Sequence, residues 1–354
     1  MEIKTFIGRK LNYVNGILRR QIELDRPLKE KSNVKLTYEY YTKPKNALDF
    51  ISKRYVFYPF YAKRRDKNKD IINHISFQYL GDLGHFLDKS RTLITCHDIF
   101  TFLIRNDFKN PYFIQKYSSS GLKKCRYIIS ISEFTKNELV QKLKISEDKV
   151  VVIKNGMNRE MFYRMAESDI DKIHPLFPEY TKILHVGNEE YRKNFITLLK
   201  ALYFLKKKIK NIKLIRVGSC SHQDILKLLN LEKDVIYLNN ISNDRLREIY
   251  NLSDLFVYPS NYEGWGAPGL EAAACETPVV CSDIPIFREV YHDYPYYFPP
   301  NNYKVLTDAI YQCLMDESLR NEMKKKGLNV VKTYSWEKSA EKYLKLARIV
   351  HEQQ

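Results

Sequence analysis

Short apolar runs alternate with amphipathic stretches along most of this chain. Runs such as Thr92–Ile99 and Lys182–Gly187 have the length and the β-branched content of buried strands. Stretches between such runs, such as Phe195–Leu205, repeat apolar residues three and four positions apart, which is typical of a helix that buries one face. Strands that alternate with helices of roughly 10–15 residues predict βαβ units and parallel sheets. A polar, proline-containing segment at 166–180 interrupts the alternation, so we expect two sheets.

The expected fold class is α/β, with two doubly wound, Rossmann-like domains that face a cleft. The predicted limits are 1–165 for the N-terminal domain, 166–180 for a linker and 181–334 for the C-terminal domain. Segment 335–354 predicts a capped amphipathic helix with no strand after it, and we expect this helix to cross back to the N-terminal domain. A length of 354 residues fits two domains of ordinary size.

Positive charge is concentrated in the first part of the chain. The formal net charge is +17, and residues 1–150 hold 30 Lys and Arg against 16 Asp and Glu. The positive electrostatic field of these residues favours an anionic partner. That partner is a nucleic acid, an anionic membrane surface or a phosphorylated substrate. A solvated lysine-rich surface is the alternative. No nucleic-acid-binding motif accompanies the charge, so nucleic acid is the weakest of these expectations.

Aromatic side chains lie between two basic clusters in the segment Lys53–Arg65. Three interpretations stay open for it. The segment is an ordinary aromatic helix face with solvated ends, a contact with a membrane interface or a lipid-linked acceptor, or a stacking surface for single-stranded nucleic acid.

No run approaches the roughly 18 apolar residues that a membrane span requires, and the N-terminus lacks a secretory pattern. The six cysteines are scattered, without a Cys-x-x-Cys pair, which indicates reduced thiols. We therefore expect a cytoplasmic protein, with the inner face of the membrane as the place for any peripheral contact.

The stretch with the most chemical content runs from Leu255 to Cys281. Two apolar strands frame a loop with three glycines, and a helix is expected to begin near Leu270. A glycine-rich loop before a helix N-terminus suits an anion. Glu263 and Glu271 frame this loop, and carboxylates accept hydrogen bonds from sugar hydroxyls. The alternative is an ordinary turn with two solvated glutamates.

His97 and Asp98 end the predicted strand at 92–99. In open α/β sheets, ligands bind outside the carboxyl ends of strands. This position therefore predicts that His97 faces the site.

These residues resemble the retaining nucleotide-sugar glycosyltransferases of glycosyltransferase family 4, which have the GT-B fold. The most specific match is Glu263-Gly-Trp-Gly-Ala-Pro-Gly-Leu-Glu271, which has the Glu-x7-Glu motif of that family. The other matches are His97-Asp98, Ser130-Ile-Ser-Glu133, Asn155-Gly156, Val186-Gly187, Arg192-Lys-Asn194, Val217-Gly218 and Ser335-Trp336-Glu337. The resemblance covers the chain from about His97 to Trp336.

The resemblance implies a role for each matched position. Ribose hydroxyls would contact Glu271, the transferred sugar would contact Glu263, and the leaving diphosphate would meet Lys193 together with Arg192. The implied catalytic residues are His97, Glu263, Arg192 and Lys193. The implied donor-binding residues are Gly16, Asn188, Arg192, Lys193, Asn240, Ile241, Glu263, Gly266, Ala267, Pro268, Gly269, Leu270 and Glu271. The acceptor-side candidates are His97, Asp98, Ser132 and Asn155.

The implied activity is retaining transfer of a sugar from a UDP-, GDP- or ADP-linked donor to a glycan or lipid-linked acceptor. No cofactor and no metal is expected, because the one Asp-x-Asp sequence, Asp169-Ile-Asp171, lies in the predicted linker. The alternatives are a nucleotide-sugar epimerase or a phosphorylase on the same fold, and a basic nucleic-acid-binding protein.

Overall fold

We describe residues 1–9, 16–31, 33–103, 112–173, 180–219 and 222–353 of a computed structural model of this chain. Its contacts divide the chain into two compact units. Unit 1 consists of Met1–Gly156 together with Ser335–Gln354, and unit 2 consists of Met157–Tyr334.

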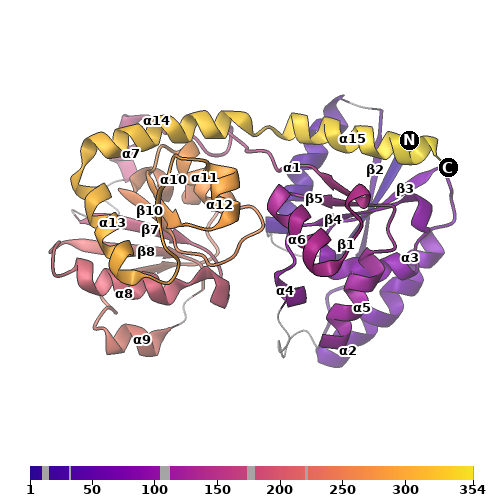
Figure 1. The fold of residues 1–354 in the computed structure, drawn as a ribbon, viewed down its shortest axis with the longest axis horizontal. Coiled ribbons are helices and arrows are strands. Elements are labelled where there is room, and N and C mark those ends of the chain that lie inside the picture. The colour runs from indigo at the N-terminus through magenta and orange to yellow at the C-terminus, as the bar shows by residue number, and fades with distance from the viewer. Residues whose placement is uncertain (10–15, 32, 104–111, 174–179, 220–221, 354) are drawn as a thin grey trace. The chain divides into compact units, whose positions relative to one another are not determined.

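Unit 1 is built on a sheet of six parallel strands in the order β2-β1-β3-β4-β5-β6 (Figure 1). The strands are β1 Glu2–Arg9, β2 Lys35–Tyr41, β3 Ile71–Ile75, β4 Thr92–Cys96, β5 Tyr127–Ser130 and β6 Val150–Val152. The α-helices are α1 Gly16–Lys31, α2 Ala47–Ile51, α3 Tyr58–Arg65, α4 Phe100–Leu103, α5 Tyr112–Leu122, α6 Glu133–Leu143 and α15 Trp336–Glu352. A π-helical segment, η1 Ser52–Phe57, joins α2 to α3.

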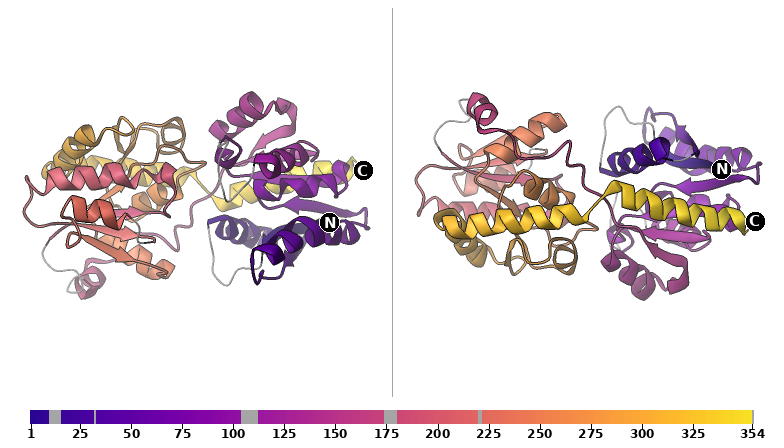
Figure 2. Two further views of the ribbon diagram at one scale, coloured as in Figure 1. Left: turned by 90° about the horizontal axis from the view of Figure 1, so that it is seen from below. Right: turned by 90° about the horizontal axis from the view of Figure 1, so that it is seen from above.

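Helices cover both faces of the unit 1 sheet. One core contains Leu122 of α5 and Leu139 of α6, and the other contains Leu24 of α1 with Tyr343 and Ala347 of α15. Helix α15 therefore lies beside α1 although the two are far apart in sequence (Figure 2).

The start of α15 is fixed at two points. Ser335 caps the helix by accepting a hydrogen bond from the N–H of Lys338, and Ser339 donates to the carbonyl oxygen of Lys154 at 2.6 Å. The chain passes so close here that a Cβ on Gly156 would lie 2.3 Å from the backbone nitrogen of Trp336. Only glycine fits at position 156 without a shift of the backbone.

Unit 2 repeats the architecture with six parallel strands in the order β12-β11-β10-β7-β8-β9. The strands are β7 Thr181–Val186, β8 Ile212–Val217, β9 Val235–Leu238, β10 Leu255–Tyr258, β11 Val279–Ser282 and β12 Tyr296–Phe298. The helices are α7 Glu167–Ile173, α8 Phe195–Leu205, α9 Gln223–Leu228, α10 Asn243–Leu252, α11 Ala267–Ala274, α12 Pro285–Tyr291, α13 Tyr303–Met315 and α14 Glu317–Thr333. Two parallel sheets with flanking helices confirm the α/β fold class.

The boundary between the units differs from the expected one. It lies after Gly156 rather than at 165, and 166–180 contains helix α7 of unit 2. The reason is a set of hydrogen bonds to Asn251, whose side chain accepts from the N–H of Met165 at 2.9 Å and donates to the carbonyl oxygen of Tyr163 at 3.0 Å. These bonds hold the segment after Gly156 on unit 2.

No helix among the described residues is long and apolar enough to cross a membrane.

Candidate active site

Two loops of unit 2 come together at the carboxyl ends of its central strands. One follows β7 and leads into α8, and the other follows β10 and leads into α11. The N–H of Asn261 donates to the carbonyl oxygen of Arg192 at 2.7 Å, and Asn194 donates to the carbonyl oxygen of Pro259 at 3.0 Å. Strands β7 and β10 are neighbours in the sheet, so residues about 70 positions apart become a single site.

The carboxylate of Glu263 is the centre of this site. It is 5% exposed and accepts from Nζ of Lys193 at 2.6 Å, from Nη1 of Arg192 at 2.8 Å and from the hydroxyl of Ser260 at 2.8 Å. Burial alone would raise the pKa of Glu263, but the charges of Lys193 and Arg192, with these hydrogen bonds, lower it to about 2. The side chain is therefore an anion that holds two cations in fixed positions.

Arg192 is also held from the solvent side. Its Nε pairs with Glu190, and Glu190 accepts a hydrogen bond from the side chain of Asn188. Asn188, expected among the donor contacts, thus acts on the site through Glu190 in this structure. The cation of Lys193 is more deeply placed, with 8% of the residue exposed and its Nζ 5.6 Å from the ring centre of Tyr258.

Helix α11 begins at Ala267, three residues before the predicted start at Leu270. Gly266 is the N-cap with a φ of 94°, which favours glycine, and proline is well placed in a first helical turn. Pro268 has no N–H, and the N–H of Gly269 already donates to the carbonyl oxygen of Gly266 at 3.2 Å. The turn therefore offers fewer amides to an anion than the sequence led us to expect, and Lys193 and Arg192 gain importance.

Gly269→Ala is expected to destabilise unit 2 by about 1–3 kcal/mol, the usual cost of overpacking. A Cβ at this position would lie 2.4 Å from the hydroxyl oxygen of Tyr291, a side chain that is fully buried and donates to the carbonyl oxygen of Gly266. Urea unfolding checks the value. Adding Tyr291→Phe should not recover the loss, because Cζ of the ring at position 291 would still lie 2.5 Å from the new Cβ. A single variant as stable as the parent chain would contradict this packing.

Glu271 lies on α11 and is 5% exposed. One of its oxygens accepts from the hydroxyl of Tyr250 at 3.1 Å, so α10 fixes the orientation of the carboxylate. Burial raises the pKa of Tyr250 well above its usual value, and the charge of Glu271 adds to that effect. The phenol therefore remains a hydrogen-bond donor.

Other predicted donor residues fall at different places. Asn240 and the half-buried Ile241 follow β9, and Asn240 has a φ of 51° in the left-handed region. Gly16 is the first residue of α1 in unit 1, where a Cβ would meet no atom of the described residues within 4 Å. The described part of the chain, which leaves out 10–15, gives no steric reason for glycine at position 16.

In unit 1, His97 lies at the carboxyl end of β4, as predicted for a strand-end residue. Its Nε2–H donates to the carbonyl oxygen of Ser76 at 3.2 Å, and its backbone N–H donates to the side chain of Gln78 at 3.0 Å. Asp98 beside it accepts from the N–H of Phe100 at 3.0 Å and so starts α4. Burial, and then the charge of Arg20, lower the pKa of His97 to about 3.

We expect the imidazole of His97 to remain neutral down to about pH 4. Because its folded pKa is about 3 against 6.5 for an ordinary histidine, protonation favours the unfolded chain, and stability should fall as pH drops below 6.5. The nitrogen chemical shifts of the ring, followed by NMR from pH 8 to pH 4 and assigned with His97→Gln, check this. A midpoint above pH 6 would contradict it.

Two acceptor-side candidates have partners of their own. The hydroxyl of Ser132 is fully buried and accepts from the N–H of Thr135 at 3.0 Å, which makes it the N-cap of α6. Asn155 accepts from Nε of Arg20 at 2.8 Å, which joins the end of β6 to α1. The structure gives both residues a structural role in unit 1.

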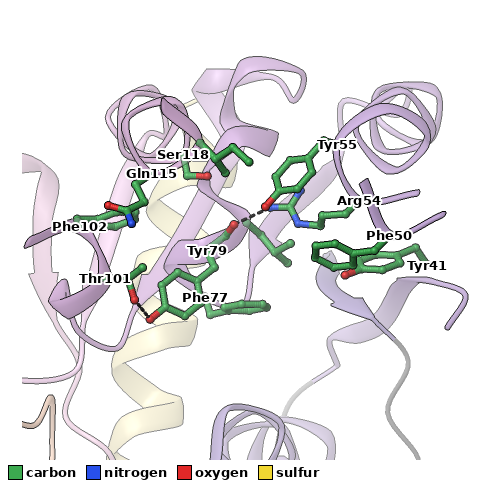
Figure 3. A pocket seen from close by; sticks show the side chains of 12 residues that line it. Tyr41, Phe50, Arg54, Tyr55, Phe77, Tyr79, Thr101, Phe102, Gln115 and Ser118 are labelled. Carbon is green, nitrogen blue, oxygen red and sulfur yellow. Dashed lines mark hydrogen bonds between the residues drawn. The ribbon is translucent and has the colours of Figure 1, made fainter. Parts of the chain in front are cut away.

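A pocket of about 200 Å³ in unit 1 was not predicted (Figure 3). It lies near the carboxyl ends of β2, β3 and β4, and its lining is largely aromatic. The lining residues are Tyr41, Phe50, Arg54, Tyr55, Phe77, Tyr79, Leu80, Thr101, Phe102, Ile114, Gln115 and Ser118. Arg54 reaches the pocket from η1, donates to the carbonyl oxygen of Tyr79 at 2.6 Å and forms a buried ion pair with Asp82.

Two residues of the site were not predicted: Ser260 as a partner of Glu263, and Arg216 near the turn at Gly187. A signal for Arg216 existed, since it is a cation inside an apolar strand directly before Val217-Gly218. Position 216 is 1% exposed in the structure.

Unit 2 thus carries a buried cluster of two cations and a carboxylate next to a helix start, within a double parallel-sheet fold. The family model described as glycosyl transferases group 1 matches residues 166–330. The model described as glycosyltransferase family 4 matches residues 25–161. The protein is therefore a glycosyltransferase, and it is similar to the family 4 type that the sequence motif indicated.

Two relatives of this chain are O-antigen chain mannosyltransferases by name. O-antigen chain mannosyltransferase B of Escherichia coli is 29% identical over 282 residues, which are 76% of this chain and 72% of that protein. O-antigen chain mannosyltransferase RfbU of Salmonella typhimurium is 28% identical over 224 residues, 61% of this chain and 59% of that protein.

Solved structures share the fold over the whole chain. Sucrose-phosphate synthase from Thermosynechococcus elongatus has a TM-score of 0.78 at 19% identity and 100% coverage of both chains. HepE of Anabaena, solved in complex with UDP-glucose, has a TM-score of 0.78 at 16% identity, with 98% of this chain and 99% of that chain covered.

Proposed function

We propose that unit 2 binds a nucleotide sugar and that the enzyme transfers a mannosyl group from it, with retention, to a growing polysaccharide. The observation that carries the donor site is the fixed pair of cations, Lys193 and Arg192, on the buried carboxylate of Glu263. The mannosyl group and the polysaccharide acceptor rest on the two O-antigen mannosyltransferases to which the chain is similar.

The proposed chemistry needs positive charge at the leaving group. As the bond between the anomeric carbon and the phosphate oxygen breaks, its electron pair goes to the diphosphate and the sugar becomes cationic. Lys193 and Arg192 would stabilise the diphosphate, and Glu263 would lie near the sugar. Fixed cations act without reorganising during the reaction, so we propose that transfer does not require a divalent metal. The acceptor hydroxyl would attack the anomeric carbon from the face that the diphosphate leaves. Its proton would pass to an oxygen of the diphosphate.

For the acceptor, we propose the aromatic pocket of unit 1 (Figure 3). Aromatic rings with a few polar groups suit the apolar face of a sugar ring, and Tyr79 and Thr101 supply hydroxyl groups that already form a hydrogen bond with each other. The ion pair between Arg54 and Asp82 gives the wall a fixed shape.

We also propose a peripheral membrane contact through the exposed side of η1 and α3. Phe57 is 65% exposed and Phe60 is 58% exposed, while Lys63 and Arg64 lie on the surface close to them in sequence. Tyr58 and Ala62 of the same segment are buried, so part of the segment is an ordinary packed helix face. Exposed rings beside cations suit the boundary of an anionic bilayer.

Vesicle sedimentation tests the membrane contact. Binding to vesicles that contain phosphatidylglycerol should exceed binding to pure phosphatidylcholine, fall with added salt, and weaken in Phe57→Ser with Phe60→Ser. Equal binding to both vesicle types, or none, would remove this part of the proposal.

Thermal shifts with UDP, GDP, ADP and their sugars test the donor site, since a ligand that binds only the folded chain raises its melting temperature. The nucleotide sugar that binds is then incubated with and without a polysaccharide acceptor, in the presence of a chelator. Transfer that depends on the acceptor and survives the chelator supports the proposal. Conversion of the donor without an acceptor would indicate an epimerase, and the absence of any shift would reject the donor site.

A further inference from the structure

Arg216 on β8 is a buried arginine with an incomplete set of partners. The residue is 1% exposed, and its Nη2 donates to the carbonyl oxygen of Asn188 at 2.9 Å. Its Nε and Nη1 are buried and have no hydrogen-bond partner among the described residues. No carboxylate in that part of the chain forms an ion pair with it.

The guanidinium lies at the same turn as the cation of Lys193. A Cβ placed on Gly187 would lie 3.6 Å from Nη1 of Arg216 and 3.6 Å from Cδ of Lys193. The planar group also stacks on Phe195, the first residue of α8, with its central carbon 4.5 Å from the ring centre. Ring stacking and one carbonyl oxygen hold the guanidinium in place, and the N–H groups of Nε and Nη1 have no acceptor among the described residues.

Burial lowers the pKa of Arg216 to about 10, and the charge of Glu189 opposes this effect without forming an ion pair with Arg216 among the described residues. Arg216 is paired in register with His185 on β7, which is fully buried and donates from Nδ1 to the carbonyl oxygen of Val257 at 2.9 Å. Burial, and then the charge of Arg216, hold the pKa of His185 well below its usual value, so the ring is neutral. Burying a charged group without its hydrogen bonds is costly, and an anion supplied from outside would offset that cost.

We infer that Arg216 is a third cation of the donor site and binds a phosphate oxygen of the nucleotide through Nη1, the nitrogen next to the Gly187 turn. Nη1 carries two N–H groups on a delocalised cation, and such charged donors suit a phosphate group. The inference rests on the proposed function of unit 2 as the donor site. Arg216 complements Lys193 and Arg192, because its charge is not neutralised by Glu263.

The test compares diphosphate binding with nucleoside binding. Calorimetry measures the binding of UDP, GDP and ADP, and of uridine, guanosine and adenosine, to the parent chain, Arg216→Met and Arg216→Lys. We expect Arg216→Met to lower the affinity for the nucleoside diphosphate by about 10–100-fold, which is the usual contribution of hydrogen bonds to a charged group. Arg216→Lys keeps the charge without the planar set of N–H donors, and its loss of affinity should be smaller. Binding of the matching nucleoside should change less than about twofold in either variant, because its contacts lie elsewhere.

Arg320→Met is the matched control. Arg320 is a half-buried arginine of unit 2 that donates to the carbonyl oxygens of Cys313 and Leu314 at 2.9 and 2.5 Å. Its loss should lower the melting temperature and leave diphosphate affinity unchanged. Arg216→Met should instead lower diphosphate affinity. The melting temperature of the ligand-free variant should equal or exceed that of the parent, because a charge with too few hydrogen bonds has been removed.

Three results would overturn the inference. If the parent chain binds none of UDP, GDP and ADP, the donor site itself is rejected and Arg216 with it. If the parent binds and Arg216→Met binds equally well, only the role of Arg216 falls. If nucleoside and diphosphate affinities fall together with the melting temperature, Arg216 is a packing residue.

Discussion

Lys193→Met is expected to lower kcat for sugar transfer by about 10²–10³-fold, the usual effect of removing one fixed charge from a transition state. Negative charge on the diphosphate is greatest when the sugar bond breaks, so the loss should fall mainly on kcat and less on KM. Nζ of Lys193 lies 2.6 Å from the carboxylate of Glu263 in a buried site, so water cannot easily replace it.

The fold should survive this change. Glu263 keeps its hydrogen bonds from Arg192 and Ser260 at 2.8 Å each, so its carboxylate is not left alone. Steady-state kinetics with the donor identified by thermal shift, together with a melting curve, separate catalysis from folding.

Lys206→Met is the matched control for Lys193→Met. Lys206 also forms an ion pair in unit 2, with Asp234, but its side chain is 33% exposed. The kcat of Lys206→Met should stay within about twofold of the parental kcat, as for most surface changes. A Lys193→Met variant that keeps more than a third of the parental kcat would show that Lys193 does not neutralise the leaving group.

Elements with clear local signals were predicted from the sequence with their true limits. The cap at Ser132 and the apolar spacing after it predict a helix over Glu133–Leu143, and helix α6 has these bounds. The apolar patterns also predict a helix over Phe195–Leu205 and a strand over Leu255–Tyr258, which are the bounds of α8 and β10. These signals lie within a few residues of the element that they define, so periodicity and capping rules detect them.

The segment after β11 was not predicted. Helix α12 and strand β12 are short, and their formation depends on tertiary burial of aromatic rings rather than on a repeating pattern. Tyr291 is fully buried, and its ring centre lies 5.5 Å from that of Tyr294. Periodicity has too few residues to act on in elements of this length.

The site was predicted in its residue types but not in its pairing. The motif supplied Glu263 and Glu271, and the resemblance supplied Arg192 and Lys193. That both cations bind Glu263 follows from the adjacency of β7 and β10 in the sheet. Strand order is a property of the whole fold and is not encoded in any one stretch. For the same reason, Arg216 could be located in a strand but not linked to the turn at Gly187.

Glu263→Gln should separate binding of the nucleoside diphosphate from binding of the nucleotide sugar. The change frees Lys193 and Arg192 from their shared anion, so the product, UDP or GDP, should bind at least as tightly as to the parent. The phosphates of the nucleotide sugar gain the same attraction to Lys193 and Arg192. The sugar, however, loses the carboxylate that we propose accepts hydrogen bonds from its hydroxyls. We therefore expect its affinity to fall relative to that of the product, and kcat to fall by at least about 10²-fold.

The same variant should change the acid stability of unit 2. The pKa of Glu263 is lowered from 4.5 to about 2 in the folded chain, so its stabilisation is complete above pH 4.5 and is lost as pH falls through 2. The difference corresponds to about 3 kcal/mol in the free energy of unfolding, since one pKa unit is about 1.4 kcal/mol. Glu263→Gln should therefore lower stability at pH 7 and reduce its decline between pH 4.5 and pH 2.

Glu322→Gln gives the same change of charge at an exposed position. Glu322 pairs with Lys326 on the surface of α14, with 59% of its side chain exposed, and its loss should alter neither nucleotide affinity nor acid unfolding. Weaker binding of UDP or GDP in Glu263→Gln than in Glu322→Gln would mean that Glu263 serves mainly to position the two cations. The affinity gained because the two cations no longer share an anion would then be smaller than the affinity lost because they are no longer held in position.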